Sequence, residues 1–587
     1  MVAPITYEDR VIVKDNYLVY QKDPSRRFFV KGIAFPVAPI HEHKNNDDHD
    51  DEYSSFYNAK GWIAILRQLR KASPHINTIR LYELYDVHDY SEFFHEAARL
   101  GFYLVLPLTS GQASTGGILN RNKPAPHCYT EDLYHYGTTI VDSILLNTTS
   151  IANSIVSTYP NILAAVLGNE VMNSLPAWQA APCILAFGRD LKRHALSTLQ
   201  QQTFQTDHEE DLIRRLHDLL PPFMYATQHD GIGAAVSPAE MVQWTLEYMA
   251  TCAANNHILV RSSDQPISVI DIFGINIESW CSSEQQFGVN SDGTIGTYLD
   301  LYQQLAALQS IQIGNDSNNE TESHGTPVQV PILFSEVGCS KQLFNRDNGL
   351  RTPGQIQRQS AARDWKQLSV IMGLPMKTVW SGFVAYSYGG PTYFRMTKGG
   401  LWDGVHPLDI DTTDMHNFLN ELNKSSTLEL MESNSSSLTD NRGTSVEDGL
   451  GNETTLPLTA VTHALPSHFD SVEDHCANVQ ERFETYCKVK FVPVSRIPSF
   501  VKDKELVIGG GTTTAFASRT IPRPFSPYAV TAVLVTTVVL VVGLVLFLLR
   551  YAKQKPRKWW PFRQDKTEEL SSLVNPASKD SYRTFAS

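Results

Sequence analysis

The chain has 587 residues, and its 49 Lys and Arg against 62 Asp and Glu give a formal net charge of −13. An acidic chain lacks the basic face that a nucleic-acid-binding protein needs, and a hydrophobic fraction of 42% excludes global disorder. Seven cysteines are too few for a disulfide scaffold of this length. The composition therefore indicates a large folded domain with appended segments.

Eight short apolar segments, rich in Val, Ile, Phe and Tyr, are spaced along the first 400 residues. They are near-continuous rather than alternating, which is typical of strands buried on both faces. The segments are 28–35, 76–82, 103–108, 162–170, 223–228, 269–276, 330–336 and 379–388. Helix-like stretches lie between them, such as 59–71, 90–100, 134–158, 182–200 and 238–252. Strands that alternate with helices predict an α/β fold, a (β/α)8 TIM barrel. A doubly wound open sheet is the alternative, but no Gly-rich phosphate loop follows the first strand.

The rest of the chain changes in composition along its length. We predict that residues 1–410 form the barrel domain and that 411–460 form a Ser/Thr/Asn-rich glycosylated linker or insertion. Residues 461–527 would form a small membrane-proximal stalk containing Cys476 and Cys487, 528–550 one transmembrane helix, and 551–587 a basic cytoplasmic tail.

The transmembrane prediction rests on residues 529–549, which contain no charged side chain. At 1.5 Å per residue these span roughly 30 Å, the thickness of a bilayer's hydrocarbon core. Lys and Arg gather directly after the span, so the positive-inside rule places the tail in the cytoplasm. A GPI-anchor signal is the alternative, but it would end with the apolar run, and here residues 551–587 follow.

The expected location is the plasma membrane, with a single pass and with the barrel outside. Six N-x-S/T sequons, all before the span, agree with it: Asn147, Asn315, Asn319, Asn423, Asn434 and Asn452. The first residues show no signal peptide, because no basic segment is followed by an apolar one. We expect a leader that precedes this sequence; export by the C-terminal span is the alternative.

Two glutamates each close a buried-strand pattern, Glu170 in AAVLGNE and Glu336 in VPILFSE. In a parallel barrel, strand ends meet at the mouth where active sites lie. Retaining glycosidases need two carboxyl groups about 5–5.5 Å apart, one as acid/base and one as nucleophile. Asn169, directly before Glu170, could hold a sugar 2-hydroxyl beside the proton donor.

Aromatic residues at other strand ends suit the faces of sugar rings, although they could equally be core residues: Tyr225, Trp280, Tyr386 and Tyr388. His41-x-His43 and the acidic residues after it could suggest a metal site. Their spacing is irregular, so a solvated loop is the simpler interpretation, and we expect no metal and no cofactor.

Short matches in the correct order show that residues 11–400 resemble glycoside hydrolase family 72, the β-1,3-glucanosyltransferases that elongate fungal cell-wall glucan. The matching segments are 30–34 (VKGIA), 77–82 (NTIRLY), 88–89 (HD), 120–121 (NR), 167–173 (LGNEVMN), 189–192 (RDLK), 225 (Y), 273–276 (FGIN), 280–281 (WC), 334–339 (FSEVGC), 379–382 (VWSG) and 386–388 (YSY). The chain is identified as a divergent member.

The resemblance implies a retaining double displacement with Glu170 as acid/base and Glu336 as nucleophile. It adds Tyr82 and Asn276 to the expected substrate-binding residues, and it implies a Cys281–Cys339 disulfide. Cys252 resembles a family cysteine with a distant downstream partner, for which Cys476 and Cys487 are candidates, and Cys128 could pair with Cys183. The chain departs from the family's groove residues at Pro36, Pro107, Glu278 and Ser387.

The expected function is that of a β-1,3-glucanosyltransferase, which cleaves β-1,3-glucan and transfers the donor to another glucan chain in cell-wall remodelling. Its partners would be donor and acceptor glucan chains and the membrane, with no nucleic acid. Two alternatives stay open: a retaining β-1,3-glucan hydrolase, favoured by the altered groove residues, and a non-catalytic glucan-binding membrane receptor. Retention of both glutamates argues against the receptor.

Overall fold

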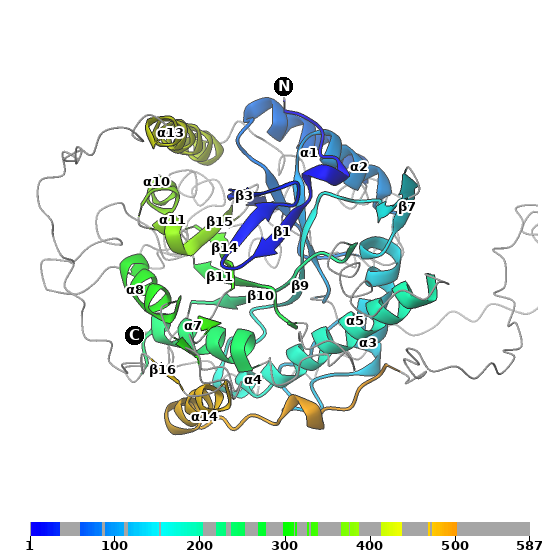
Figure 1. Ribbon diagram of the computed structural model, residues 1–587, viewed down its shortest axis with the longest axis vertical. Helices are drawn as coiled ribbons and strands as arrows, with labels where there is room; N and C mark the ends of the chain where they lie inside the picture. The colour runs from blue at the N-terminus through cyan, green and yellow to red at the C-terminus, as the bar shows by residue number, and fades with distance from the viewer. Residues whose placement is uncertain are drawn as a thin grey trace, which may run out of the picture. The chain divides into compact units, whose positions relative to one another are not determined.

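A computed structural model gives the structure of the chain (Figure 1). It describes residues 2–35, 59–84, 89–110, 116–151, 154–202, 219–229, 236–252, 268–277, 297–309, 312–313, 326–327, 330–338, 365–374, 376–386, 413–436, 468–469 and 472–501. Residues Met1–Gly509 form one compact unit and Gly510–Ser587 a second, and every described residue belongs to the first.

Eight parallel strands close into a barrel, which confirms the predicted TIM barrel. In barrel order they are β4 (Val30–Ala34), β5 (Thr78–Arg80), β6 (Tyr103–Pro107), β9 (Ile162–Asn169), β10 (Phe223–Gln228), β11 (Ile272–Ile277), β14 (Ile332–Val337) and β15 (Trp380–Ala385). Each lies within or beside one of the eight predicted segments. The open sheet is excluded because β15 pairs with β4, with Gly382 opposite Val30.

Closure of the barrel depends on Gly382. Its φ of +132° is a backbone conformation that glycine adopts readily and other residues rarely do. A Cβ at this position would lie 2.2 Å from the Val30 carbonyl oxygen. Any side chain would therefore push the last strand away from the first.

A three-stranded antiparallel sheet, β1 (Val11–Lys14), β2 (Tyr17–Tyr20) and β3 (Asp23–Arg27), covers the amino end of the barrel (Figure 1). Val11 and Leu18 join the apolar cluster that fills the barrel interior with Val105, Met224 and Leu333. Because this end is plugged, the strands' carboxyl ends are the accessible mouth.

Helices surround the barrel, and their apolar faces pack on the outside of the strands (Figure 1). They are α1 (Ala59–Ala72), α2 (Ser91–Arg99), α3 (Glu131–Ile140), α4 (Leu175–Trp178), α5 (Ala181–Gln202), α7 (Pro238–Leu246), α8 (Thr297–Gln309), α10 (Gln367–Met372) and α11 (Met376–Val379). Two of these helices begin with N-terminal capping residues. The Thr130 side chain caps the Leu133 N–H, and Ser237 forms a capping box with Glu240 ahead of α7.

The helix predicted over 134–158 is too long. After α3 and a π-helical turn (η4, Val141–Leu145), the chain forms a hairpin of β7 (Thr148–Ile151) and β8 (Ser154–Ser157). The hairpin residues read TTSI and SIVS, and their β-branched side chains favour strands.

The boundary predicted at residue 410 also differs from the structure, since the compact unit extends to Gly509. Within the predicted linker, helix α13 (Thr413–Ser436) buries Phe418 and Leu422 in the main core. Within the predicted stalk, residues 472–501, here called the strap, comprise α14 (Val472–Arg482), a π-helical turn (η9, Phe483–Cys487) and a 3-10 turn (η10, Val494–Arg496). The strap packs on the barrel because its apolar residues, such as Phe483 and Phe491, are buried in the main hydrophobic core.

A disulfide, an ion pair and a ring stack hold the first part of the strap. Cys476 forms a disulfide with Cys252, and the Arg482 guanidinium pairs with the buried Glu247 carboxylate. The Phe491 ring stacks on Tyr248, with 4.0 Å between centroids. No helix among the described residues is apolar over enough length to span a bilayer. The predicted span at 529–549 lies outside the described ranges.

Candidate active site

The two predicted carboxylates lie at the carboxyl ends of neighbouring parts of the barrel. Glu170 follows the last residue of β9, and Glu336 lies near the end of β14, three strands further around. Glu336 is buried, with 5% of its surface exposed, whereas Glu170 is half-buried. One carboxylate is thus enclosed by the barrel, and the other faces its mouth.

Glu170 has an unusual backbone conformation. Its φ is +50°, in the left-handed region that few residues other than glycine adopt. Two hydrogen bonds hold it: its N–H donates to the Ala226 carbonyl at 2.9 Å, and its own carbonyl accepts from Arg121 Nη1 at 3.2 Å. Such conformations cost about 1–3 kcal/mol and persist where the surrounding structure enforces them, often at active sites. The sharp turn ends β9 at this residue.

Asn276, on β11 between the two carboxylates, connects them. Its Nδ2 donates to Glu170 Oε1 at 2.8 Å and to Asn169 Oδ1 at 3.0 Å. Asn276 is also the ladder partner of Glu336. The amide therefore orients Glu170 and Asn169 from the strand that lies directly beside Glu336.

Arg80, at the end of β5, is the cation of the site and is 1% exposed. Its Nη1 lies 3.1 Å from Glu336 Oε1 and 2.6 Å from the Ser335 carbonyl oxygen. Its Nη2 donates to Asn169 Oδ1 at 2.6 Å. One guanidinium thus reaches both strand ends that carry the carboxylates, and its charge favours the ionised form of Glu336.

Tyr82 supports the same carboxylate. Its hydroxyl donates to Glu336 Oε1 at 2.9 Å. Burial, together with the negative charge of Glu336, raises the pKa of Tyr82 well above its ordinary value. The phenol therefore stays protonated and remains a donor at any pH at which the protein functions. Its ring packs edge-to-face on Tyr386, with 6.1 Å between centroids.

Five of the predicted site residues meet at the mouth around Glu336: Glu170, Asn169, Asn276, Tyr82 and Tyr386. Tyr225 differs from its predicted sugar-binding role, because it is fully buried and its hydroxyl accepts a hydrogen bond from the Met172 N–H at 3.4 Å. It supports the loop after Glu170. Trp280, Tyr388, Glu278, Ser387 and Pro36 lie outside the described residues.

The sequence did not indicate the role of Arg80, although the segment that contains it, residues 77–82, resembles the family. The available signal was an arginine at the end of a buried strand pattern, since a buried charge requires a partner. Its partners come from β9, β11 and β14, so no local pattern could have identified them.

The described cysteines form two disulfides, Cys128–Cys183 and Cys252–Cys476. The sequence left both pairings open: Cys128–Cys183 was one possibility, and Cys476 and Cys487 were both candidates for Cys252. Cys487 is a buried free thiol, and burial raises its pKa to about 11. The predicted Cys281–Cys339 bridge falls outside the described ranges, as does the His41-x-His43 loop. Among the residues that are described, no group of His, Cys, Asp or Glu could hold a metal ion.

Comparisons with known proteins agree with the expected family. Residues 4–204 match the family model of glycoside hydrolase family 72, described as glucanosyltransferase. The 1,3-beta-glucanosyltransferase PGA5 of Candida albicans is 22% identical over 373 residues, which cover 63% of this chain and 43% of that protein. The 1,3-beta-glucanosyltransferase GAS5 of Saccharomyces cerevisiae is 23% identical over 410 residues, 69% of this chain and 60% of that protein. The chain spans about half the length of the curated relatives it matches.

A solved structure of Saccharomyces cerevisiae Gas2p in complex with laminaripentaose is 18% identical, with a TM-score of 0.41. The alignment covers 72% of this chain and 70% of that one.

Proposed function

We propose that this chain, whose resemblance to the glucanosyltransferases of glycoside hydrolase family 72 is confirmed over residues 4–204, is a retaining β-1,3-glucanosyltransferase. The observation that carries the proposal is the connected cluster at the barrel mouth. Arg80 and Tyr82 both donate to Glu336 Oε1, and Asn276 donates to Glu170 Oε1. The two carboxylates are thus held by different donors and can take different roles.

In the first step the Glu336 carboxylate attacks the anomeric carbon of the donor glucan. A glycosyl ester forms while the glycosidic C–O bond breaks, and the Glu170 carboxylic acid gives its proton to the leaving oxygen. Arg80 and Tyr82 suit Glu336 to this role, because a cation and a neutral donor favour an ionised, oriented carboxylate.

In the second step Glu170, now ionised, removes a proton from a hydroxyl of the acceptor glucan. That oxygen attacks the anomeric carbon, the ester bond to Glu336 breaks, and the anomeric configuration is retained. Asn169 lies beside Glu170 and is exposed at the mouth, where its side chain can contact a sugar hydroxyl. Transfer requires the acceptor to compete with water for the glycosyl ester.

The test uses the full chain with a defined laminari-oligosaccharide and follows product lengths by mass spectrometry. Products longer than the substrate, absent with Glu336→Gln, are the expected result. Absence of any turnover of β-1,3-oligosaccharides would contradict the proposal.

Hydrolysis is the second candidate function, and Pro107 favours it. This residue ends β6 at the mouth and is buried, so it supplies neither a polar side chain nor a backbone N–H to hold a glucan. A weakly held acceptor would lose to water. Products that are only shorter than the substrate would identify a hydrolase.

We further propose that the chain is anchored in the plasma membrane by residues 529–549, with the barrel outside. The uncharged length of this segment and the basic residues after it support the assignment. Protease treatment of intact cells should remove the barrel and leave the tail protected. Loss of the tail under the same treatment would contradict the orientation.

A further inference from the structure

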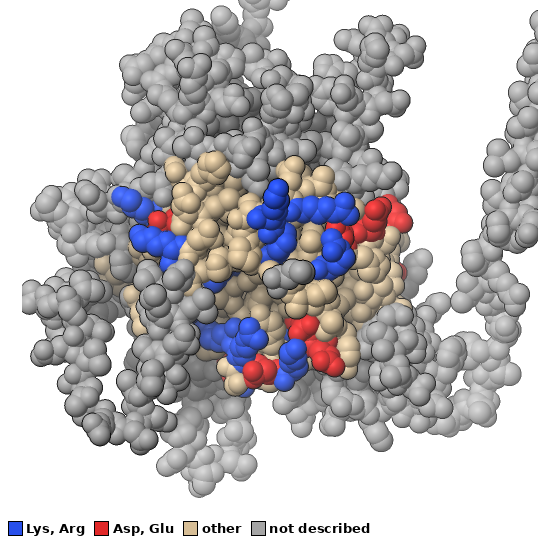
Figure 2. Space-filling model, turned by 90° about the horizontal axis from the view of Figure 1, so that it is seen from above, with Lys and Arg blue, Asp and Glu red and all other residues tan. Residues whose placement is uncertain are grey.

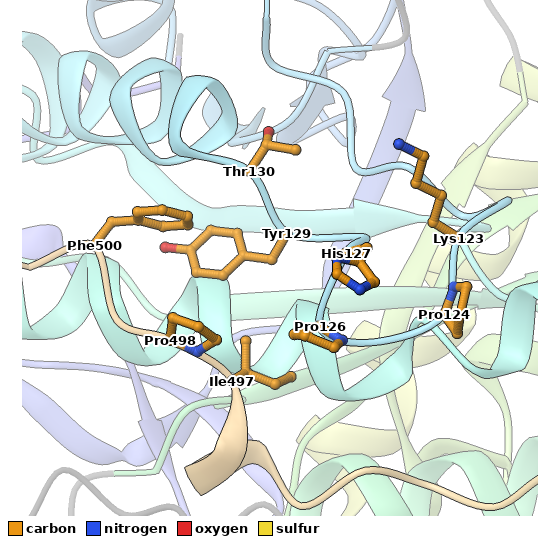
Figure 3. Close-up of a pocket in the computed structure, with 9 residues that line it drawn as sticks. All are labelled: Lys123, Pro124, Pro126, His127, Tyr129, Thr130, Ile497, Pro498 and Phe500. Carbon is orange, nitrogen blue, oxygen red and sulfur yellow. The ribbon is translucent and has the colours of Figure 1, made fainter.

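A second concave site lies outside the barrel mouth, between the loop that precedes α3 and the end of the strap (Figure 3). Its volume is about 560 Å³, within the range of pockets that bind small ligands. Six of the residues that line it carry rings: Pro124, Pro126, His127, Tyr129, Pro498 and Phe500. No carboxylate lines it, and Lys123 supplies a single cation at the rim.

The loop wall of this pocket is rigid. Cys128, between the lining residues His127 and Tyr129, is bonded to Cys183 of α5. The Ala125 N–H donates to the Gln179 carbonyl at 3.3 Å, and the His127 N–H donates to the Pro124 carbonyl at 2.9 Å. These bonds fix the ring-bearing residues of the loop before any ligand arrives.

The strap wall is also held from below, by α5. Arg189 donates to the carbonyl oxygens of Val494 and Ile497 at 3.1 and 3.4 Å. The Asp190 carboxylate accepts from the Ser499 hydroxyl and from the Phe500 N–H, each at 3.0 Å. The same carboxylate accepts from the Tyr129 hydroxyl at 3.0 Å, so one buried group holds both walls together.

This pocket is connected to the catalytic residues. The loop that forms it begins at Arg121, whose guanidinium donates to the carbonyl of Glu170 at 3.2 Å. Between Arg121 and the first lining residue, Lys123, stands only Asn122. One loop therefore runs from the turn at Glu170 to the wall of the pocket.

We infer that the pocket is a second glucan-binding site, which takes sugar residues of a β-1,3-glucan chain away from the point of cleavage. A neutral sugar presents C–H faces, which pack on rigid rings, and hydroxyl groups, which bond to a few polar side chains. The ring-lined walls supply the first, and Lys123, His127 and Thr130 at the exposed rim supply the second. The inference rests on the proposed function, because it assumes that the substrate is a long glucan.

The binding experiment uses the full chain carrying Glu336→Gln, so that glucan is held without turnover. Affinity for a soluble β-1,3-glucan polymer and for laminaritriose is measured by titration calorimetry. In this background, His127→Ala with Pro498→Ala removes two exposed rings of the pocket. Arg496→Ala is the matched control, since this exposed side chain lies on the strap outside the pocket.

We expect the double variant to bind the polymer about three- to tenfold more weakly than the control, with laminaritriose binding unchanged. In the active background, it should turn over short oligosaccharides at the wild-type rate but show a raised KM for the polymer. Polymer affinity equal to that of Arg496→Ala would overturn the inference.

Failure of the two proposals can be told apart. If the wild-type chain turns over oligosaccharides while the double variant binds polymer normally, only the second site is refuted. If the wild-type chain neither cleaves nor binds β-1,3-glucan, the proposed function fails, and the inference that depends on it is overturned as well.

Discussion

Two buried ionic networks, one at the barrel mouth and one beneath the strap, use similar residues in different ways. Asp190, under the strap, is fully buried, and its two oxygens accept from Arg189, Tyr129, Ser499 and the Phe500 N–H. Glu170, at the mouth, is half-buried, and its carboxylate accepts from Asn276 alone among the described residues. A carboxylate whose oxygens are saturated by donors has no capacity left for a substrate, whereas a sparsely bonded one does.

The cations differ in the same way. Arg189 extends to two backbone carbonyls of the strap and so joins segments that are 305 and 308 residues apart. Arg80 extends to the Glu336, Asn169 and Asn276 side chains at the mouth, as well as to the Ser335 backbone carbonyl. The strap network should therefore affect stability, and the mouth network should affect catalysis.

The largest effect is expected for Glu336→Gln. The amide cannot form the glycosyl ester, so turnover of laminari-oligosaccharides should fall by at least about 10³-fold. The amide oxygen can still accept from Tyr82, but the buried Arg80 charge loses its partner, so the free energy of unfolding should fall by about 3 kcal/mol. Activity assays and denaturant unfolding measure the two effects, and turnover by the folded fraction at the wild-type rate would contradict the nucleophile assignment.

Arg80→Met should affect both stability and catalysis. Glu336 would be left as a buried carboxylate without its cation, which costs about 3–5 kcal/mol when one partner of a buried pair is removed. Losing the cation also disfavours ionisation of Glu336, so the acidic limb of the pH–rate profile should move to higher pH. Arg80→Lys keeps the positive charge, so its acidic limb should lie closer to that of the wild type than the acidic limb of Arg80→Met. An unchanged acidic limb in Arg80→Met would contradict electrostatic support of Glu336.

Asp190→Asn should mainly destabilise the strap. The change leaves the Arg189 charge buried without its partner, at a cost of about 3 kcal/mol. Denaturant unfolding and protease sensitivity of residues 494–501 measure the loss. Asp142→Asn is a control, since this carboxylate forms an exposed pair with His194. The folded fraction of both variants should still turn over short oligosaccharides. Loss of this activity in Asp190→Asn would show that the strap network also affects catalysis, which contradicts the separation of the two networks.

The smallest effect concerns His475, which is fully buried in α14. Burial, and then the nearby Arg482 charge, lower its pKa to about 4, whereas an unfolded histidine titrates near 6.5. Between these values the unfolded state binds a proton that the folded state does not, so stability falls as pH falls. At pH 5 the free energy of unfolding should be about 2 kcal/mol lower than at neutral pH because of this residue.

The control for this prediction is His475→Gln, whose unfolding free energy should depend less steeply on pH between 6.5 and 4. Identical pH dependence in the wild type and the variant would show that His475 does not contribute.

Much of the fold could be predicted from the sequence, because parallel strands buried on both faces are continuous apolar runs. All eight barrel strands match such runs. Glu170 and Glu336 stand out in the sequence because each closes such a run. The hairpin at 148–157 differs from the predicted helix because its residues continue a helix-like apolar stretch, whereas their β-branching favours strands.

The strap and α13 could not be predicted from local composition. A Ser- and Asn-rich sequence such as α13 is typical of a linker, yet Phe418 and Leu422 join the main core. Likewise, Cys476 alone could not show that 472–501 packs beside α7 through Cys252. Packing of this kind depends on an apolar surface that other segments create.

The sequence by itself determined the barrel, the two carboxylates and the resemblance to a glucanosyltransferase family, because each is carried by local runs of residues. Tertiary structure alone decided that Arg80 serves Glu336, that Tyr225 is buried support, and that Arg189 and Asp190 clamp the strap beside a ring-lined pocket. The physical reason is that a buried charge is stabilised by whichever partners the fold brings within hydrogen-bond distance. Those partners come from strands and helices that are distant in the sequence.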